Sequence, residues 1–155
     1  MLLHVSIAAH DPRHVAHVLA ELWDGEALPF APVGGAWIAM AGDARGSGIE
    51  VYPKGRALVP GHDQDMFQTQ DQLNPPPFGS THVAIQCTKS QTEIEAIAAR
   101  EGWRAVLCSC GGMFDVIEFW LENCTLIEVL TPSMQADYRA TSSIEAWREA
   151  IGQEI

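Results

Sequence analysis

The stretch His4-Val5-Ser6-Ile7 decides the fold, because a close copy, His82-Val83-Ala84-Ile85, follows it at an offset of 78 positions (82 − 4). A second pair of matching stretches, Ile49-Glu50-Val51 and Ile127-Glu128-Val129, has the same offset of 78. Similarity at one fixed period indicates a duplicated structural unit. Each half of the chain therefore begins with a histidine-bearing strand and ends with a glutamate-bearing strand.

The segment between the first pair of stretches has the pattern of a helix followed by strands. Asp11-Pro12 supplies a capping side chain and a proline at the first helical position. An apolar stripe at i, i+3, i+4 and i+7 follows, formed by Val15, Val18, Leu19 and Leu22. Gly25 is expected to end this helix. Short apolar runs then predict strands over residues 27–33, 36–41 and 48–53.

The second half repeats this order. A strand is predicted over residues 81–87, and Ser90 with Glu93 forms the pattern of a capping box at the start of a helix. Gly102 is expected to end that helix, and further strands are predicted over residues 105–108, 114–121 and 125–130. We therefore predict an α+β fold made of two βαβββ modules, residues 1–54 and 80–132, within a single domain of residues 1–155.

Two segments fall outside the repeat. Residues 55–79 contain Pro60, Pro75, Pro76 and Pro77 among many polar residues, so a long functional loop or a linker is expected there. Residues 133–155 are expected to contribute a C-terminal helix, which an apolar stripe places between Ser143 and about Ile151.

Strand alternation places the repeated polar residues on one face of each module. The apolar neighbours of each histidine and glutamate point the opposite way, toward the helices. Two imidazoles and two carboxylates suit a divalent ion such as Ni, Zn, Co, Fe or Mn. The predicted metal ligands are His4, Glu50, His82 and Glu128. The alternatives are hydrogen-bonded histidines on a polar sheet face and glutamates paired with basic residues, although the chain has only nine Lys and Arg.

Other polar residues accompany these four. Ser6 lies on the same strand face as His4, and Tyr52 lies on the same strand face as Glu50, so both are candidate substrate-binding residues. Glu118, with Asp115 nearby, lies on a strand that can face the same cavity and is a further candidate for substrate binding. Cys108 and Cys110 are expected to be plain buried thiols.

Composition narrows the classes of partner. Of 155 residues 47% are apolar, enough for a sizeable core, and the formal net charge of −11 argues against nucleic acid and anionic membranes as partners. No signal peptide and no membrane-spanning run are visible. The four cysteines have irregular spacing, which favours a reducing, cytoplasmic setting.

The paired motifs resemble those of the vicinal oxygen chelate superfamily, the glyoxalase I-like fold. Its members are built from paired βαβββ modules that form a U-shaped sheet around a metal. The four-ligand set His4, Glu50, His82 and Glu128 looks most like bacterial glyoxalase I. The chain departs from that pattern in the turn before the last glutamate, which is Glu122-Asn123-Cys124-Thr125 rather than Asp-Pro-Asp-Gly. No set of glutathione-contacting residues is evident, which argues against methylglyoxal–glutathione as the substrate.

The resemblance implies a metal-dependent lyase or isomerase that acts on a small substrate with vicinal oxygens. The metal is expected to chelate those oxygens and to stabilise an enediolate. Glu128 is the first candidate for the general base and Glu50 the second. An extradiol-type dioxygenase and a non-enzymatic small-molecule binding protein are the alternatives. A homodimer is also implied by the resemblance.

Overall fold

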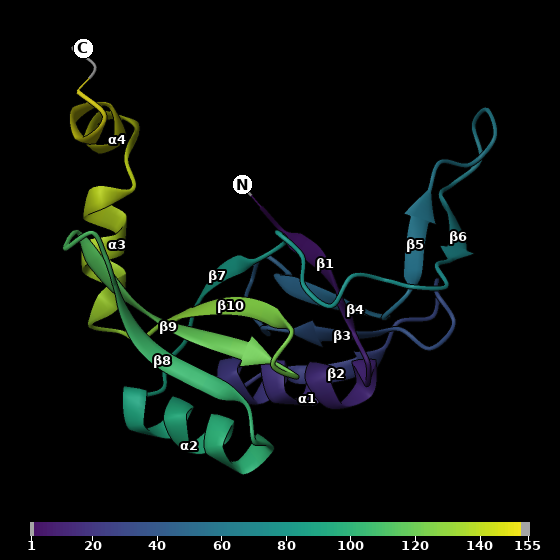
Figure 1. Ribbon diagram of the computed structural model, residues 1–155, viewed down its shortest axis with the longest axis horizontal. Helices are drawn as coiled ribbons and strands as arrows, with labels where there is room; N and C mark the ends of the chain where they lie inside the picture. Colours follow the sequence, from purple (N-terminus) through teal and green to yellow (C-terminus); the bar gives the residue numbers. More distant parts are fainter. Residues whose placement is uncertain (1, 153–155) are drawn as a thin grey trace. The chain divides into compact units, whose positions relative to one another are not determined.

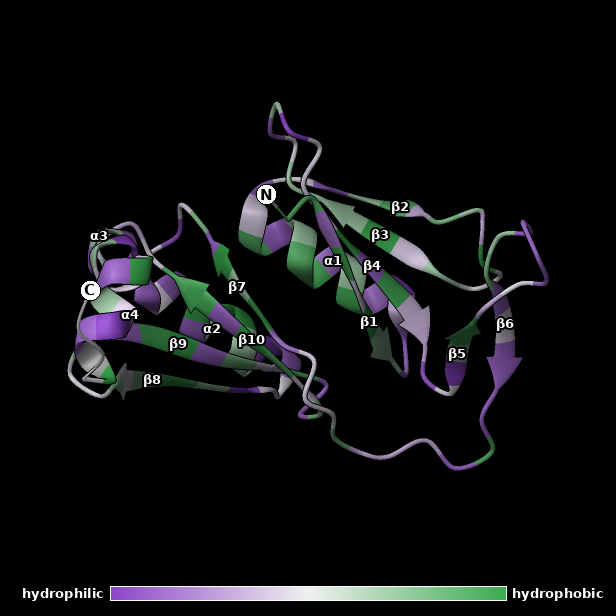
Figure 2. Ribbon diagram, turned by 90° about the horizontal axis from the view of Figure 1, so that it is seen from above, coloured by the Kyte–Doolittle hydropathy of each residue, from purple (hydrophilic) through white to green (hydrophobic). Residues whose placement is uncertain are grey.

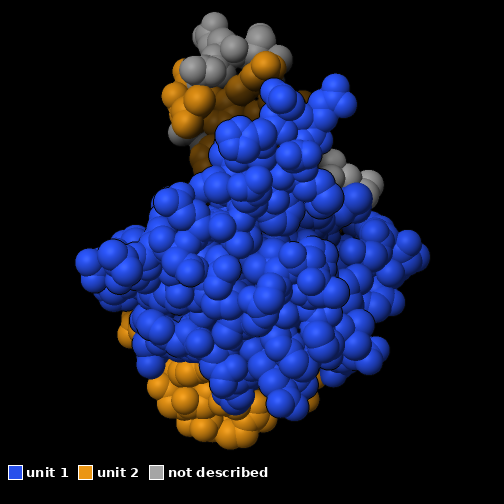
Figure 3. Space-filling view, turned by 90° about the vertical axis from the view of Figure 1, so that its right-hand side faces the viewer, with its two compact units in different colours: residues 1–82, 121–125 blue, residues 83–120, 126–155 orange. Residues whose placement is uncertain are grey.

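The computed structural model describes residues 2–152, which form two compact units (Figures 1 and 3). Unit 1 comprises the chain up to His82 together with Leu121–Thr125, and unit 2 comprises Val83–Trp120 and the chain from Leu126 onward. Each unit contains one four-stranded sheet, and each sheet belongs to one βαβββ module. The fold class predicted from the sequence repeat is therefore confirmed.

Unit 1 contains the first module. Its strands are β1 (His4–Ala9), β2 (Glu26–Pro29), β3 (Trp37–Met40) and β4 (Gly48–Pro53), in the sheet order β1-β4-β3-β2. Strands β1 and β4 are parallel neighbours although most of the module separates them in sequence. Helix α1 (Pro12–Trp23) contacts all four strands and covers one face of this sheet. The other face is left for polar residues.

Helix α1 forms and packs as its sequence predicts. The Asp11 side chain accepts a hydrogen bond of 3.0 Å from the backbone N–H of His14, and Pro12 is the first helical residue. The stripe residues Val15, Leu19 and Leu22 are fully buried. The helix ends at Trp23, and Asp24 is the left-handed cap. Gly25 was predicted to end the helix, but Asp24 does so. A glycine fits at position 25 because a Cβ there would lie 2.0 Å from the Met40 carbonyl oxygen.

Unit 2 contains the second module. Its strands are β7 (Val83–Gln86), β8 (Arg104–Cys110), β9 (Phe114–Leu121) and β10 (Thr125–Leu130), in the order β7-β10-β9-β8. Helix α2 (Gln91–Glu101) begins with the predicted capping box of Ser90 and Glu93 and ends at Gly102 in the left-handed conformation. The core residues of this module include the fully buried Phe119, Ile117, Ile127 and Ile94.

The strand register confirms the offset of the repeat. In the first module Glu50 on β4 lies opposite Ser6 on β1, and in the second module Glu128 on β10 lies opposite Ala84 on β7. Ala84 is the residue 78 positions after Ser6. The predicted strand over residues 81–87 is shorter than expected, because β7 begins only at Val83 and His82 directly precedes it.

The segment of residues 55–79 is not a plain loop. It contains an antiparallel hairpin of β5 (Arg56–Val59) and β6 (Gln68–Asp71), which extends away from the four-stranded sheet of unit 1 (Figure 1). Figure 2 shows that β6 is hydrophilic along its length. Strand β6 lacks the apolar alternation that identifies strands in a sequence, and β5 has only three successive apolar residues, Ala57, Leu58 and Val59. These features explain the missed prediction.

The C-terminal segment holds two helices where the sequence predicted one. Helix α4 (Ile144–Ala150) agrees with the predicted helix, and α3 (Met134–Thr141) precedes it. No residue of α3 is buried, so it leaves no apolar stripe in the sequence. Residues 153–155 of the predicted segment lie outside the described residues. None of the helices described is both long enough and apolar enough to cross a bilayer.

Candidate metal and substrate site

Glu50 occupies the middle of β4 and is the only charged residue that is buried among those the structure describes, with a relative exposure of 9%. Its neighbours Ile49 and Val51 are completely buried on the helix-covered face of the sheet. Because side chains alternate along a strand, the Glu50 carboxylate is directed to the opposite face. A buried carboxylate without partners is costly, so the groups around it are informative.

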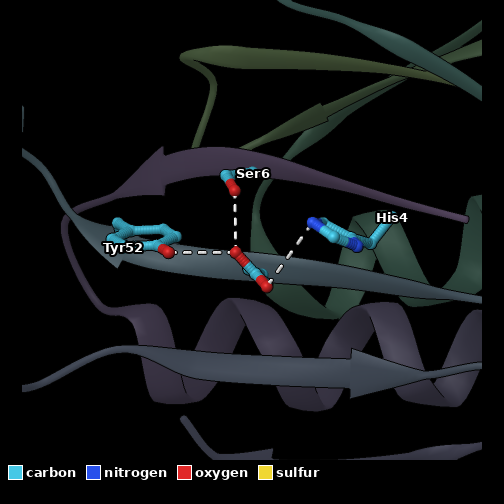
Figure 4. A network of polar contacts seen from close by, with 4 residues as sticks. His4, Ser6 and Tyr52 are labelled. Carbon is cyan, nitrogen blue, oxygen red and sulfur yellow. Dashed lines mark hydrogen bonds and ion pairs between the residues drawn. The ribbon is translucent and has the colours of Figure 1, made fainter. Parts of the chain in front are cut away.

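Two hydroxyl groups hold one oxygen of this carboxylate. Ser6 Oγ on β1 and Tyr52 Oη on β4 donate hydrogen bonds of 2.8 Å and 2.9 Å to Glu50 Oε2. Figure 4 shows Ser6 and Tyr52 directed at the carboxylate from two strands, with His4 on its other side. Hydrogen bonds to an ionised acceptor are stronger than neutral ones. They fix the Glu50 side chain in one orientation and leave Oε1 for another partner.

The Tyr52 hydroxyl is strongly biased toward its neutral form. Burial, followed by the adjacent Glu50 carboxylate, raises the pKa of Tyr52 from 10.0 to about 12. Deprotonation would place a second negative charge beside Glu50 in a poorly solvated site. Tyr52 is therefore a hydrogen-bond donor to Glu50 throughout the physiological pH range.

His4 completes a pair of the kind that binds a divalent ion. Its Nε2 atom lies 3.8 Å from Glu50 Oε1, beyond hydrogen-bonding distance. Two ligands that each lie about 2.1 Å from one ion in tetrahedral geometry are about 3.4 Å apart. The His4 side chain is 62% exposed and is free to close this small difference. The chemistry and spacing of this pair fit half of the predicted metal site.

The surroundings of Glu128 differ. It lies on β10 between the buried Ile127 and Val129, opposite Ala84, and none of the described residues donates a hydrogen bond to its carboxylate or forms an ion pair with it. Its electrostatic neighbours are thiols. Burial and then Glu128 raise the pKa of Cys110, whereas burial and then Glu118 raise the pKa of Cys108. Both thiols are partly exposed, so the expectation that they are plain buried thiols is wrong as to burial.

Glu118 and Asp115, the other candidates in this module, lie on opposite faces of β9. Glu118 is partly buried on β9 and accepts a hydrogen bond of 3.2 Å from the Trp120 indole N–H. Asp115 is exposed and lies an odd number of residues away on the same strand, which places it on the other face. Glu118 therefore shares the face of the two thiols, and Asp115 does not.

His82 is exposed, and its Nδ1 atom lies 3.3 Å from the Ser80 carbonyl oxygen. His4, Glu50 and His82 belong to unit 1, whereas Glu128 belongs to unit 2. Across residues 2–152, no group of three His, Cys, Asp or Glu side chains is gathered as a metal site. The structure thus brings together the His4–Glu50 pair, and the meeting of all four residues at one ion stays a prediction.

A pocket of about 330 Å³ adjoins the hydroxyl groups that hold Glu50. Ser6 and Tyr52 contribute to its wall, as do Lys54 and Arg56, which the sequence analysis did not single out. Lys54 lies in the turn after β4, and Arg56 begins β5 in a separate two-stranded sheet. Strand alternation does not extend through a turn, so no strand pattern marks these two residues in the sequence.

Comparison with solved structures shows that the chain shares its fold with a fosfomycin resistance protein and with a glyoxylase/bleomycin resistance protein/dioxygenase domain. The fosfomycin resistance protein FosX from Listeria monocytogenes superposes with a TM-score of 0.56 and 12% identity, over 90% of this chain and 97% of that chain. A glutamate-to-glutamine mutant of that FosX, complexed with Mn(II) and 1S,2S-dihydroxypropylphosphonic acid, gives a TM-score of 0.53 and 14% identity, over 83% of this chain and 87% of the other.

A glyoxylase/bleomycin resistance protein/dioxygenase domain from Frankia sp. EAN1pec is also similar, with a TM-score of 0.50 and 17% identity, over 83% of this chain and 94% of that chain. No protein-family sequence model and no curated protein matches the sequence significantly. The resemblance recognised in the histidine and glutamate motifs is confirmed at the level of the fold.

Proposed function

We propose that this protein is a metal-dependent lyase or isomerase of the glyoxalase kind, which acts on a small substrate with two neighbouring oxygens. The observation that carries this proposal is the His4–Glu50 pair, with 3.8 Å between Nε2 and Oε1. The same residue types recur at His82 and Glu128, and the strand register reproduces the position of the glutamate. The FosX neighbour that contains Mn(II) supports a divalent ion on this fold.

The proposed ligands are His4, Glu50, His82 and Glu128, a set that suits Ni, Zn, Co, Fe or Mn. A bound divalent ion supplies Lewis-acid stabilisation of the negative charge that develops on the substrate oxygens. Glu50 is suited to a fixed ligand role, because Ser6 and Tyr52 occupy its Oε2 and leave Oε1 beside His4.

Glu128 is the better candidate for moving a proton between adjacent substrate carbons. None of the described residues donates a hydrogen bond to its carboxylate, so its orientation is less restrained than that of Glu50. A general base needs freedom to approach the proton that it takes and later returns. Its contribution to the metal would then be shared with, or alternate with, this proton transfer.

Metal analysis of protein purified without added metal tests the proposal. About one equivalent of Ni, Zn or Co per site supports the isomerase or lyase, whereas Fe favours an extradiol-type dioxygenase. Absence of metal together with tight binding of a small molecule would instead indicate a non-enzymatic binding protein. Light scattering of the same sample tests the accompanying proposal of a homodimer.

Variants sharpen the ligand assignment. His4→Ala and His82→Ala are each expected to abolish metal retention, because each removes one of the two imidazoles. His62→Ala is a matched control, since this exposed histidine lies between β5 and β6 outside both modules. Unchanged metal content in His82→Ala would contradict the ligand assignment.

A further inference from the structure

We propose that the pocket beside Glu50 binds a small organic anion, with Lys54 holding the anionic group and the proline segment covering the apolar part. This inference rests on the proposed function, since it names the class of substrate for the same site. The pocket is lined by residues of β1, the end of β4, the β5–β6 hairpin, the segment of residues 72–81 and the turn residues Cys124 and Thr125, all of which belong to unit 1.

The charged residues that line the pocket are basic, whereas the protein as a whole is acidic. The whole chain has 20 acidic and nine basic residues, yet the residues that line this pocket include Lys54 and Arg56 and no aspartate or glutamate. Two carboxylates contact this wall from outside the pocket: Glu50 accepts from the hydroxyls of Ser6 and Tyr52, and Asp71 pairs with Arg56. The ammonium of Lys54 is therefore the lining charge that favours an anionic ligand over a cationic one.

Lys54 is the cation with donor capacity to spare. Its Nζ atom donates one hydrogen bond, of 2.8 Å, to the carbonyl oxygen of Pro77. A lysine ammonium has three donors, so two are left for a ligand. The structure gives Lys54 no carboxylate partner among the described residues. Its charge is therefore available to an anion in the pocket.

Arg56 already has interaction partners within the protein. Its Nε atom lies 3.0 Å from Asp71 Oδ1, an ion pair that lacks hydrogen-bond alignment, and its Nη1 atom donates to Thr69 Oγ1 at 3.3 Å. These contacts join the two strands of the hairpin and place one wall of the pocket. Lys54 is therefore expected to contribute more than Arg56 to the binding of an anion.

The rest of the wall is suited to a compact apolar body. Ile7, Leu58, Phe78 and the run Pro75, Pro76 and Pro77 line it. Its volume of about 330 Å³ is at the small end of the range of about 300–1,000 Å³ that is usual for ligand pockets. Ser6 and Tyr52 are shared between this wall and Glu50, so a ligand in the pocket lies next to the proposed metal ligands.

A matched pair of probes tests the inference. Phenylacetate and phenylacetamide have the same apolar ring, and only the first carries a negative charge. Ligand-observed NMR with full-length protein in EDTA is expected to show that phenylacetate binds about tenfold more tightly or better, the advantage of a charge-assisted hydrogen bond over a neutral one. Equal binding of the two probes, or no binding of phenylacetate, would overturn the inference.

The chain offers a close control, because Lys54 and Lys89 are its only lysines. Lys54→Met is expected to reduce the preference for phenylacetate to within about twofold, whereas Lys54→Arg should retain most of it. Lys89→Met makes the same change of net charge outside the pocket and should leave the preference intact. A preference that survives in a folded Lys54→Met would contradict the inference.

Metal content, measured on each purified protein before EDTA is added, separates this inference from the proposed function. Absence of the acid preference in wild-type protein that was purified with its metal would overturn the assignment of the pocket alone. Preference for phenylacetate in wild-type protein that never retains metal would support the pocket and overturn the enzyme class.

Discussion

The carboxylate in each module lies at the same register position but in different surroundings. Glu50 lies opposite Ser6 and accepts hydrogen bonds from Ser6 and Tyr52, whereas the positions 78 residues later hold Ala84 and Leu130. Neither alanine nor leucine can donate a side-chain hydrogen bond. The two copies share the histidine and the glutamate, but only the first copy has the side chains that restrain the glutamate.

This difference indicates a division of tasks within one proposed site. A carboxylate held by two donors keeps one direction, as a metal ligand requires. A carboxylate without a donor is free to turn toward the substrate atom whose proton it moves.

The largest expected effect is on stability. Glu50→Ala removes the acceptor of two buried or half-buried hydroxyls and should lower the free energy of unfolding by about 2–4 kcal/mol. Glu128→Ala removes no hydrogen bond and should change it by less than about 1 kcal/mol. Urea denaturation of both variants in EDTA measures the difference, and equal losses would remove the basis for the contrast.

A smaller loss is expected when the donors are removed singly. Tyr52→Phe and Ser6→Ala should each cost about 1–2 kcal/mol, since each leaves Glu50 with one donor fewer. Because both hydroxyls bond the same oxygen, the double variant should not show the simple sum. A double-mutant cycle with Glu50→Gln measures the coupling, and strict additivity would contradict a shared network.

The titration of Tyr52 gives a pH test. Its pKa is raised from 10.0 to about 12, so between these values the folded protein retains a proton that the unfolded chain releases. This contribution to stability is complete below pH 10 and is lost as the pH rises toward 12. In Tyr138→Phe, Tyr52 is the only tyrosine left, and its phenolate absorbance should appear near pH 12. Glu50→Gln should lower this value, and an unchanged titration would contradict the role of Glu50.

The smallest effect concerns the thiols of the second module. Burial is the largest cause of the raised pKa of both thiols. The next largest cause is Glu128 for Cys110 and Glu118 for Cys108. Glu128→Gln should therefore speed alkylation of Cys110 about two- to threefold, because more thiolate forms. Glu118→Gln should act mainly on Cys108. Mass spectrometry after iodoacetamide treatment distinguishes the two cysteines. Faster alkylation of Cys108 and not of Cys110 in Glu128→Gln would contradict the influence of Glu128 on Cys110.

The sequence predicted those features that depend on local pattern and on the repeat. The strand faces of Glu50 and Glu128, both helix starts and the strands of the two modules follow from alternation, capping and the offset of 78. Helix α3 and the β5–β6 hairpin were missed, because α3 buries no residue and β6 is polar on both faces. Their sequences contain no periodic apolar signal.

The identities of several site residues could be predicted from the sequence, but the contacts that they make could not. Ser6 and Tyr52 were expected to bind substrate, and the structure places both in the pocket wall and also on Glu50 Oε2. That second role depends on how β1 pairs with β4, which a single-strand pattern does not specify. Lys54 and Arg56 were missed because their position depends on the hairpin and the proline segment that fold over them.

X-ray absorption of the metal-loaded protein tests the central claim most directly, because it counts the imidazoles bound to the ion. Two histidine ligands, one from each module, are expected in the wild-type protein, and no protein-bound ion is expected in desalted His82→Ala. A spectrum with two imidazoles that is unchanged by His82→Ala, or with no imidazole at all, would contradict a site shared by the two modules.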